Sequence, residues 1–112
     1  MAIDLVLRGG TVVDGSGQKA FTADVAVKDG RIAEIGKVAG KGAREIDADG
    51  LLVTPGFIDG HTHFDAQINW DPLGTSSCWH GVTSVVMGNC GFSIAPVKRK
   101  KEALVVRNLE RA

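Results

Sequence analysis

The sequence has no excess of either charge sign, no long apolar run and few cysteines, and each absence excludes a class of protein. Its 13 basic and 13 acidic residues give a formal net charge of zero, so no general electrostatic attraction to nucleic acid or membrane is expected. No apolar stretch approaches the roughly 20 residues that cross a bilayer as a helix. Two cysteines, Cys78 and Cys90, give little support for a disulfide framework, and reduced thiols are expected.

The start of the sequence also lacks the profile of a signal peptide. Met1, Ala2, Ile3 and Asp4 do not form the basic and then apolar segment that directs secretion, so we expect a cytoplasmic location. What is present is 112 residues, of which 44% are hydrophobic and 23% charged. This is typical of a soluble globular chain long enough for one domain or parts of two.

Residues 1–54 have the pattern of consecutive short strands, which predicts an antiparallel β unit. The strongest signal is Asp29-Gly30, a pair suited to a type I′ turn, which should join strands at 24–28 and 31–35 so that Val27 faces Ile32. Further strands are predicted at Leu5–Leu7, Thr11–Val13, Glu45–Ile46 and Leu51–Val53. No helix is needed in this half.

Residues 55–112 have a different pattern, which predicts β/α units and a parallel sheet. An apolar run and a histidine-bearing loop are followed by a predicted helix from about Pro72 to His80 and a second apolar run from Thr83 to Met87. Val85 and Val86 are predicted to form a buried strand. The last stretch, 97–112, is predicted to be an amphipathic helix.

His61 and His63 follow the first apolar run of this half and predict a metal site. In an extended chain, side chains alternate in direction, so Asp59, His61 and His63 would point to one side. Two imidazoles can then bind one divalent ion, which makes a bound water nucleophilic and polarises a carbonyl. Asp59 and Asp65 would support these ligands. The alternative is a pair of polar loop histidines without a metal.

Cys90 follows the second apolar run, between Gly88 and Gly91, at the position that corresponds to the histidine pair. A thiolate at this strand end would reach the same metal. On composition alone, a lone cysteine is more often a small buried apolar residue. Trp70 and Trp79 are expected to be core or interface residues, because no basic and aromatic pattern surrounds them.

The segment Pro55–His63, Pro-Gly-Phe-Ile-Asp-Gly-His-Thr-His, resembles the opening motif of the amidohydrolase superfamily. The continuation resembles the N-acyl-D-amino-acid deacylase (D-aminoacylase) branch. The segments that carry this second resemblance are Phe64–Gln67, Trp70–Pro72, His80–Thr83, Gly88–Phe92 and Ala95–Pro96.

This resemblance implies a fold of mixed α and β structure, mainly β. Residues 1–54 would belong to a small β-sandwich, and residues 55–112 would begin a metal-binding (β/α)8 barrel. His61, His63 and Cys90 would be metal ligands, with one or two zinc ions in the whole enzyme. The implied reaction is hydrolysis of the N-acyl amide of a small D-amino-acid substrate by metal-activated water. Further histidines and an aspartate general base would come from later strands.

A complete barrel needs at least about 200 residues, so we interpret the chain as an N-terminal fragment that is inactive alone. Exposed strand edges predict a homo-oligomer or a swapped assembly. Two alternatives remain open. One is a cyclic amidase similar to dihydroorotase or hydantoinase, which shares the His-x-His motif, although the segment 88–91 favours the deacylase. The other is a non-catalytic β-rich module that binds a metal or a partner.

Overall fold

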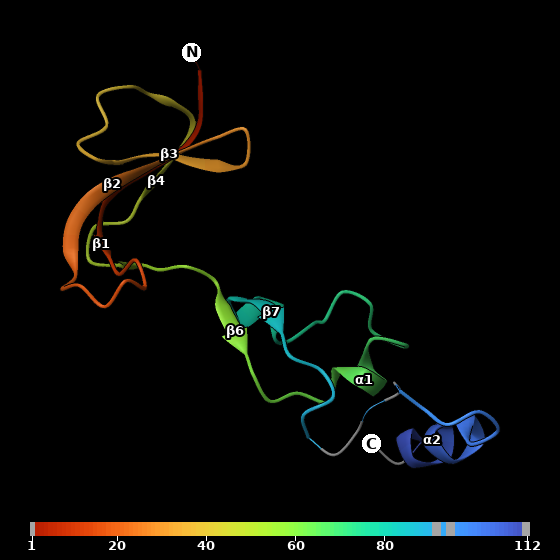
Figure 1. Cartoon of the computed structure of the whole chain (residues 1–112). Helices are drawn as coiled ribbons and strands as arrows, with labels where there is room; N and C mark the ends of the chain where they lie inside the picture. The colour runs from red at the N-terminus through yellow and green to blue at the C-terminus, as the bar shows by residue number, and fades with distance from the viewer. Residues whose placement is uncertain (1, 91–92, 94–95, 111–112) are drawn as a thin grey trace. The chain divides into compact units, whose positions relative to one another are not determined.

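The computed structural model describes residues 2–90, 93 and 96–110. It divides into two compact units, Met1–Pro55 and Gly56–Ala112, and each is described by itself (Figure 1). Parts of the family motif at Gly91, Phe92 and Ala95, and the last two residues of the predicted terminal helix, lie outside the described residues. In the described part of the chain, no helix is long and apolar enough to span a membrane.

The first unit is a five-stranded sheet without helices among its described residues. Its strands are β1 (Ile3–Val12), β2 (Phe21–Lys28), β3 (Arg31–Gly36), β4 (Gly42–Asp47) and β5 (Leu52–Val53). The hairpin between β2 and β3 confirms the prediction: Asp29 and Gly30 both have positive φ angles, 50° and 70°, and Val27 pairs with Ile32. The strand order is β3-β2-β1-β4, and β5 also pairs with β1.

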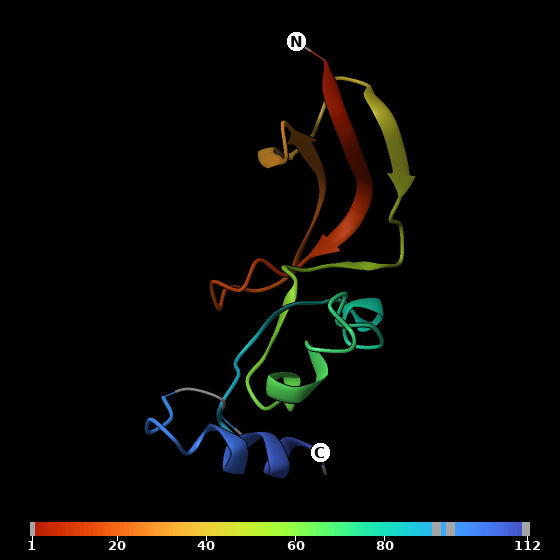
Figure 2. The ribbon, with the colours of Figure 1, turned by 90° about the vertical axis from the view of Figure 1, so that its right-hand side faces the viewer.

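The prediction of a wholly antiparallel unit is wrong, because β4 and β5 both run parallel to β1. Figure 2 shows β4 beside the long β1 strand. The connection after β3, residues 37–41, passes from one edge of the sheet to the other, so β4 pairs with β1 instead of β3. A crossover of this kind makes β4 parallel to the strand that it joins.

The two strands predicted at the start of the chain are one strand, β1, with a bulge at Gly9-Gly10. Leu7 pairs with Val25 and Gly10 with Ala23, so β1 has one residue more than β2 between these pairs. Gly9 has a φ of 67°, the left-handed conformation that favours glycine in such bulges. The extra residue places Val12 on the same face as Leu7.

Each face of the sheet has a small apolar cluster. Val6, Ala26 and Val38 are buried together on one face, where Val38 comes from the crossing connection. Val12, Ala23 and Val25 are buried together on the other face, with Leu7 and Val53 packed against them. The crossing connection is therefore held by packing as well as by hydrogen bonds.

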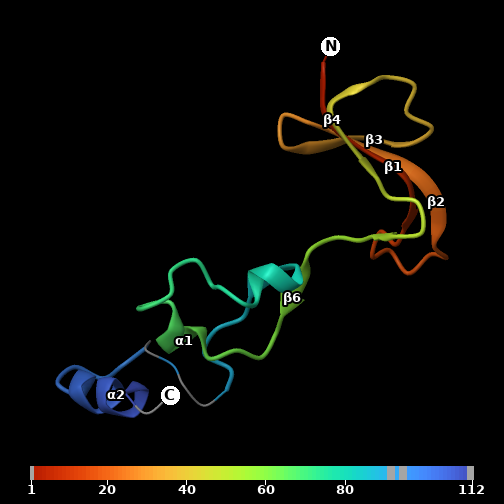
Figure 3. The same ribbon diagram turned by 180° about the vertical axis from the view of Figure 1, so that it is seen from behind.

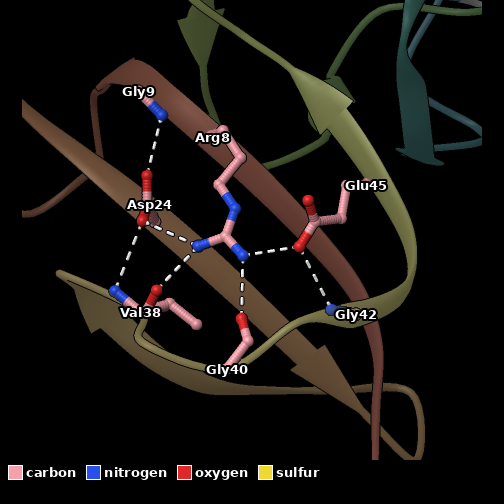
Figure 4. Close-up of polar contacts among 7 residues, drawn as sticks. All are labelled: Arg8, Gly9, Asp24, Val38, Gly40, Gly42 and Glu45. Carbon is pink, nitrogen blue, oxygen red and sulfur yellow. Dashed lines mark hydrogen bonds and ion pairs between the residues drawn. The ribbon is translucent and has the colours of Figure 1, made fainter.

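Arg8 is the centre of a polar cluster that attaches this connection to the sheet (Figure 4). Its guanidinium donates to the carbonyl oxygens of Val38 (2.7 Å) and Gly40 (2.8 Å). The same group pairs with Asp24 at 3.1 Å and with Glu45 at 2.5 Å. Arg8 therefore links β2, β4 and the connection to β1.

The second unit contains β6 (Phe57–Asp59), α1 (Phe64–Gln67), the 3₁₀ turn η1 (Cys78–His80), β7 (Val82–Val85) and α2 (Glu102–Leu109), seen from behind in Figure 3. β6 and β7 are parallel, as the alternation of apolar runs and loops predicted. The predicted terminal helix is present as α2, and it begins after the basic run at 98–101.

The helix predicted at Pro72–His80 is wrong, since only η1 is helical there. Asp71 accepts hydrogen bonds from the backbone N–H and the hydroxyl of Thr75, both at 2.7 Å. Ser76 has a φ of 65°, which a right-handed helix cannot contain. The Asp71 side chain thus stabilises a turn in place of the helix.

One burial prediction for this unit is wrong, and a second, for the two tryptophans, is wrong for the core and stays a prediction for an interface. β7 ends at Val85, and Val86 is 45% exposed, so the pair does not form a buried strand. Trp70 and Trp79 are 73% and 77% exposed, which excludes them from the core of the described unit. Both observations fit a two-stranded sheet, which covers little apolar surface.

Candidate metal centre

The carboxyl ends of β6 and β7 lie side by side, because the two strands are parallel and Asp59 pairs with Val85. The backbone N–H of Val86 donates to the carbonyl of Asp59 at 2.8 Å, so the contact continues past the end of β7. We call residues 60–65, which follow β6, the histidine segment, and residues 86–90, which follow β7, the cysteine segment. The parallel register therefore brings the two segments with candidate ligands to the same edge.

His63 and Cys90 are brought together at this edge. His63 Nε2 lies 3.0 Å from Cys90 Sγ, although 27 residues separate them in the chain. His63 is exposed, and Cys90 is half-buried. An imidazole nitrogen and a thiol sulfur are both donors that zinc prefers.

His61 has a different setting from His63. β6 ends at Asp59, and the Asp59 carboxylate accepts a hydrogen bond from the His61 backbone N–H at 3.1 Å. His63 has φ −106° and ψ 28°, which is not extended. The argument from alternating side chains therefore holds only as far as Asp59.

The described residues include no group of three or more His, Cys, Asp or Glu side chains close enough to hold a metal ion. The predicted set of His61, His63 and Cys90 is thus represented by one close pair, with His61 exposed nearby in sequence. The set itself stays a prediction.

Asp65, predicted to support the ligands, is buried in α1 at 3% exposure. Its carboxylate accepts a hydrogen bond from the backbone N–H of Gly88 at 2.7 Å. This bond joins the histidine segment to the cysteine segment two residues before Cys90. The side chain of Asp59, the other predicted supporting residue, bonds to the histidine segment at His61, whereas its backbone carbonyl accepts from Val86 in the cysteine segment.

Two further residues at this edge were missed by the sequence analysis. The Thr62 hydroxyl donates to the carbonyl of Val86 at 2.9 Å, and the Asn89 amide donates to the carbonyl of Gly60. Thr62 lies next to His63 and Asn89 next to Cys90, and this adjacency is the only feature of the sequence that points to a role for them at the site. Their bonding partners, the carbonyls of Val86 and Gly60, can be predicted only when the parallel register of β6 and β7 is known.

The donors of the close pair lie nearer to each other than two ligands of one zinc ion. Zinc lies about 2.3 Å from thiolate sulfur and about 2.0–2.1 Å from imidazole nitrogen, so a tetrahedral ion separates the two donors by about 3.5 Å. The observed 3.0 Å is about half an ångström shorter and is a hydrogen-bonding distance. A small opening of the pair would admit zinc, and the donor chemistry fits.

Asp71 is a second buried carboxylate in this unit, at 8% exposure, but it belongs to the turn after α1. Hydrogen bonds from Thr75 and then from Gln67 hold its pKa below the ordinary value of 3.8. Its partners all lie within 67–75. Asp71 therefore stabilises the turn and makes no described bond to either ligand segment.

A hollow of about 240 Å³ in this unit is lined by Phe64, Leu73, Val82 and neighbouring residues. Neither His63 nor Cys90 lines it. The hollow is an apolar gap between α1 and β7, and the donor chemistry lies at the strand ends instead.

The chain matches a protein family and several known proteins. Residues 44–110 match the model of a family described as "Amidohydrolase family". The chain is 43% identical over 99 residues to N-acyl-D-aspartate deacylase from Alcaligenes xylosoxydans xylosoxydans, a match that covers 88% of this chain and 20% of the relative. The chain thus spans about a fifth of the length of this relative.

Two solved structures have the same fold over most of the chain. N-acyl-D-glutamate deacylase from Bordetella bronchiseptica, complexed with zinc and a phosphonate inhibitor, matches with a TM-score of 0.76 and 42% identity, over 87% of this chain and 21% of that one. A D-aminoacylase studied for its binuclear metal centre matches with a TM-score of 0.77 and 41% identity, over 92% of this chain and 23% of that one. The mainly β fold with few helices agrees with these structures.

Proposed function

This chain belongs to the amidohydrolase family, and on that premise we propose that it supplies the first metal ligands of a zinc-dependent N-acyl-D-amino-acid deacylase. The observation that carries the proposal is the pairing of His63 Nε2 with Cys90 Sγ at 3.0 Å, at the carboxyl ends of two parallel strands. Active sites of parallel α/β proteins lie at this end of the sheet. The substrate of the whole enzyme would be a small N-acyl-D-amino acid.

We further propose that residues 1–54 belong to a β-sandwich and residues 55–112 to the start of a (β/α)8 barrel. The mixed sheet of the first unit and the parallel pair of β6 and β7 in the second support this division. A cytoplasmic location stays part of the proposal, and fractionation of cells that express the protein would test it.

In the proposed site, His61, His63 and Cys90 would hold the metal. A bound divalent ion supplies Lewis acidity and lowers the pKa of a water molecule towards neutrality. Within this chain, His63 and Cys90 present nitrogen and sulfur donors, and Asp59 fixes the backbone of His61 through its hydrogen bond. We propose that the remaining ligands and the general base come from residues outside these 112.

Two features favour deacylase chemistry over a cyclic amidase. The first is Cys90 beside His63, because a thiolate donor distinguishes this site from one based on the His-x-His motif alone. The second is the identity of 41–43% with deacylases over most of the chain. A non-catalytic module is disfavoured by the same family match.

The proposal is tested by elemental analysis after loading the chain with zinc and removing unbound ions. We expect bound zinc in the unchanged chain and loss of that zinc in His63→Ala and Cys90→Ala. Cys78→Ala is the matched control, because Cys78 is an exposed thiol on η1 that makes no described contact with His63. Zinc content that is unchanged in both ligand variants would refute the proposal.

A further inference from the structure

The histidine and cysteine segments are joined by side-chain hydrogen bonds that do not involve either donor of the close pair. The Thr62 hydroxyl donates to the Val86 carbonyl, and the Asp65 carboxylate accepts from the Gly88 N–H. Thr62 immediately precedes His63, and Gly88 lies two residues before Cys90. The bonds therefore connect the two segments within four residues of His63 and of Cys90.

These side chains are more buried than the candidate ligands. Thr62 is 6% exposed and Asp65 is 3% exposed, whereas His63 is exposed. A buried hydroxyl or carboxylate is costly unless a partner satisfies it. Among the described residues, no buried side-chain nitrogen or oxygen lacks a partner. Because an unpaired hydroxyl or carboxylate would be costly at these buried positions, the hydrogen bonds to Val86 and Gly88 keep the Thr62 and Asp65 side chains in one arrangement.

Asp65 also fixes the direction of the histidine segment, since it lies in the first turn of α1 and His63 is the residue at the start of that helix. Its partner Gly88 has a φ of 79°, a conformation that favours glycine. The bond of 2.7 Å to a carboxylate belongs to the stronger, charge-assisted class. It therefore sets how closely the two segments approach.

We propose that Thr62 and Asp65 are positioning residues that hold His63 beside Cys90 before a metal ion binds. This inference rests on the proposed function, because it concerns the same metal site. Without the two bonds, both segments would have to become ordered when the ion binds, and that ordering opposes binding. Residues that orient ligands in this way typically change metal affinity by about 10- to 100-fold.

The test uses Co²⁺ as a spectroscopic probe, followed by competition with Zn²⁺. A thiolate bound to Co²⁺ gives a charge-transfer absorption band, which reports on Cys90 when the chain carries Cys78→Ser. Thr62→Val keeps the side-chain shape and removes the hydroxyl, and Asp65→Ala removes the carboxylate. Thr62→Ser and Asp65→Asn retain a hydroxyl and an acceptor, respectively, and are the rescue variants.

Asp71→Ala is the matched control. Asp71 is a buried carboxylate in the same unit, but its bonds stay within 67–75. Circular dichroism of each variant reports whether the secondary structure persists. Thr62→Val keeps the test decisive if Asp65→Ala unfolds, because it changes a single polar atom.

We expect Thr62→Val and Asp65→Ala to raise the Kd for Co²⁺ by about 10-fold or more. The band should reach full intensity at saturation, since the ligands are still present. Thr62→Ser and Asp65→Asn should recover most of the affinity, and Asp71→Ala should leave it unchanged.

Three results would overturn the inference, and they are distinguishable. Unchanged affinity in Thr62→Val and Asp65→Ala would remove the positioning role and leave the proposed function in place. An equal loss of affinity in Asp71→Ala would assign the effect to general stability. A chain with no thiolate band would remove the positioning role together with the proposed metal site.

Discussion

Arg8 and Asp24 form an ion pair of 3.1 Å between neighbouring strands, and both side chains also bond to the connection that crosses the sheet. Arg8 donates to the Val38 carbonyl, and Asp24 accepts from the Val38 N–H at 3.3 Å. The backbone C=O and N–H of Val38 are thus both bonded to side chains of the sheet, to Arg8 on β1 and to Asp24 on β2. This attachment holds the connection that leads to the parallel strand β4.

Replacement of Arg8 is expected to destabilise the first unit. Arg8→Met keeps a long side chain and removes four hydrogen bonds, two of them to carbonyl oxygens of the crossing connection. We expect the Tm to fall by several degrees in thermal unfolding followed by circular dichroism. Arg44→Met, an exposed residue on β4, is the control and should change the Tm little. An equal change in both variants would show that the cluster does not stabilise the fold.

Acid should weaken the same cluster. The pKa of Asp24 is lowered from 3.8, first by the hydrogen bond from the Gly9 N–H, and the pKa of Glu45 is lowered from 4.5, first by the bond from Arg8. The folded state therefore binds fewer protons than the unfolded state. Their contribution to stability is fully present above about pH 4.5 and is lost as the pH falls through the lowered pKa values.

Arg8→Met should change the pKa values of Asp24 and Glu45 by different amounts, because the main cause of the lowered pKa differs between them. The pKa of Glu45 should rise towards its ordinary value, because the variant removes the hydrogen bond from Arg8, which is the largest cause of the lowered pKa. The pKa of Asp24 should stay partly lowered, because the Gly9 N–H remains. Carboxyl carbon chemical shifts, followed by NMR during an acid titration, measure both values. A parallel return of both pKa values would contradict the assigned causes.

The sequence predicted the local features of this sheet and missed those that depend on distant contacts. Asp29-Gly30 predicted the hairpin because the turn geometry is set by those two residues alone. The connection that leads to the parallel strand β4 is bonded to Arg8 through Val38, and these two residues lie 30 positions apart. The helix predicted after Pro72 failed because the Asp71 side chain competes for the backbone N–H of Thr75.

The same division applies to the candidate metal centre. The proximity of His63 and Cys90 follows from a simple rule, because residues after two parallel strands meet at one edge. The bond from Thr62 to the Val86 carbonyl depends on side-chain rotamers and register, which periodicity does not specify. The extended geometry assumed for His61 and His63 ended at Asp59, where the segment turns towards α1.

The bulge in β1 gives a prediction about two adjacent glycines with different roles. A Cβ atom at Gly10 would lie 2.5 Å from Val53 Cγ2, whereas nothing would lie within 4 Å of one at Gly9. Gly10→Ala should therefore destabilise by overpacking, by about 1–3 kcal/mol. Gly9→Ala should destabilise by backbone strain at φ 67°, by about 1–2 kcal/mol.

Val53→Ala distinguishes the two causes. It removes Cγ2 and should recover part of the stability lost in Gly10→Ala, but none of that lost in Gly9→Ala. Urea unfolding of the single and double variants gives the coupling energy directly. Equal coupling of Val53→Ala to both glycine variants would contradict the assignment of steric contact to Gly10 alone.

The first unit is expected to associate through one apolar face. Ile32 and Ile35 on the edge strand β3 are 65% and 44% exposed, and both line an apolar hollow with Val25. Exposed edges and apolar faces promote pairing between chains. Ile32→Lys should lower the mean mass in light scattering. Glu34→Lys, which shares β3 but pairs with Ala26 on the other face, is the control. A monodisperse monomer in the unchanged chain would exclude association.

Finally, the 112 residues alone are expected to show no zinc-dependent deacylation of an N-acyl-D-aspartate. Zinc in catalytic sites takes three protein ligands and keeps a position for water, whereas the described residues present one close donor pair, His63 and Cys90. The deacylase relative from Alcaligenes, assayed in the same buffer, is the positive control. Release of the free amino acid measures the rate. The contrary outcome is zinc-dependent turnover by this chain that disappears in His63→Ala. It would show that residues of this chain complete the site. The further ligands and the general base that we propose from outside the 112 residues would then not be required.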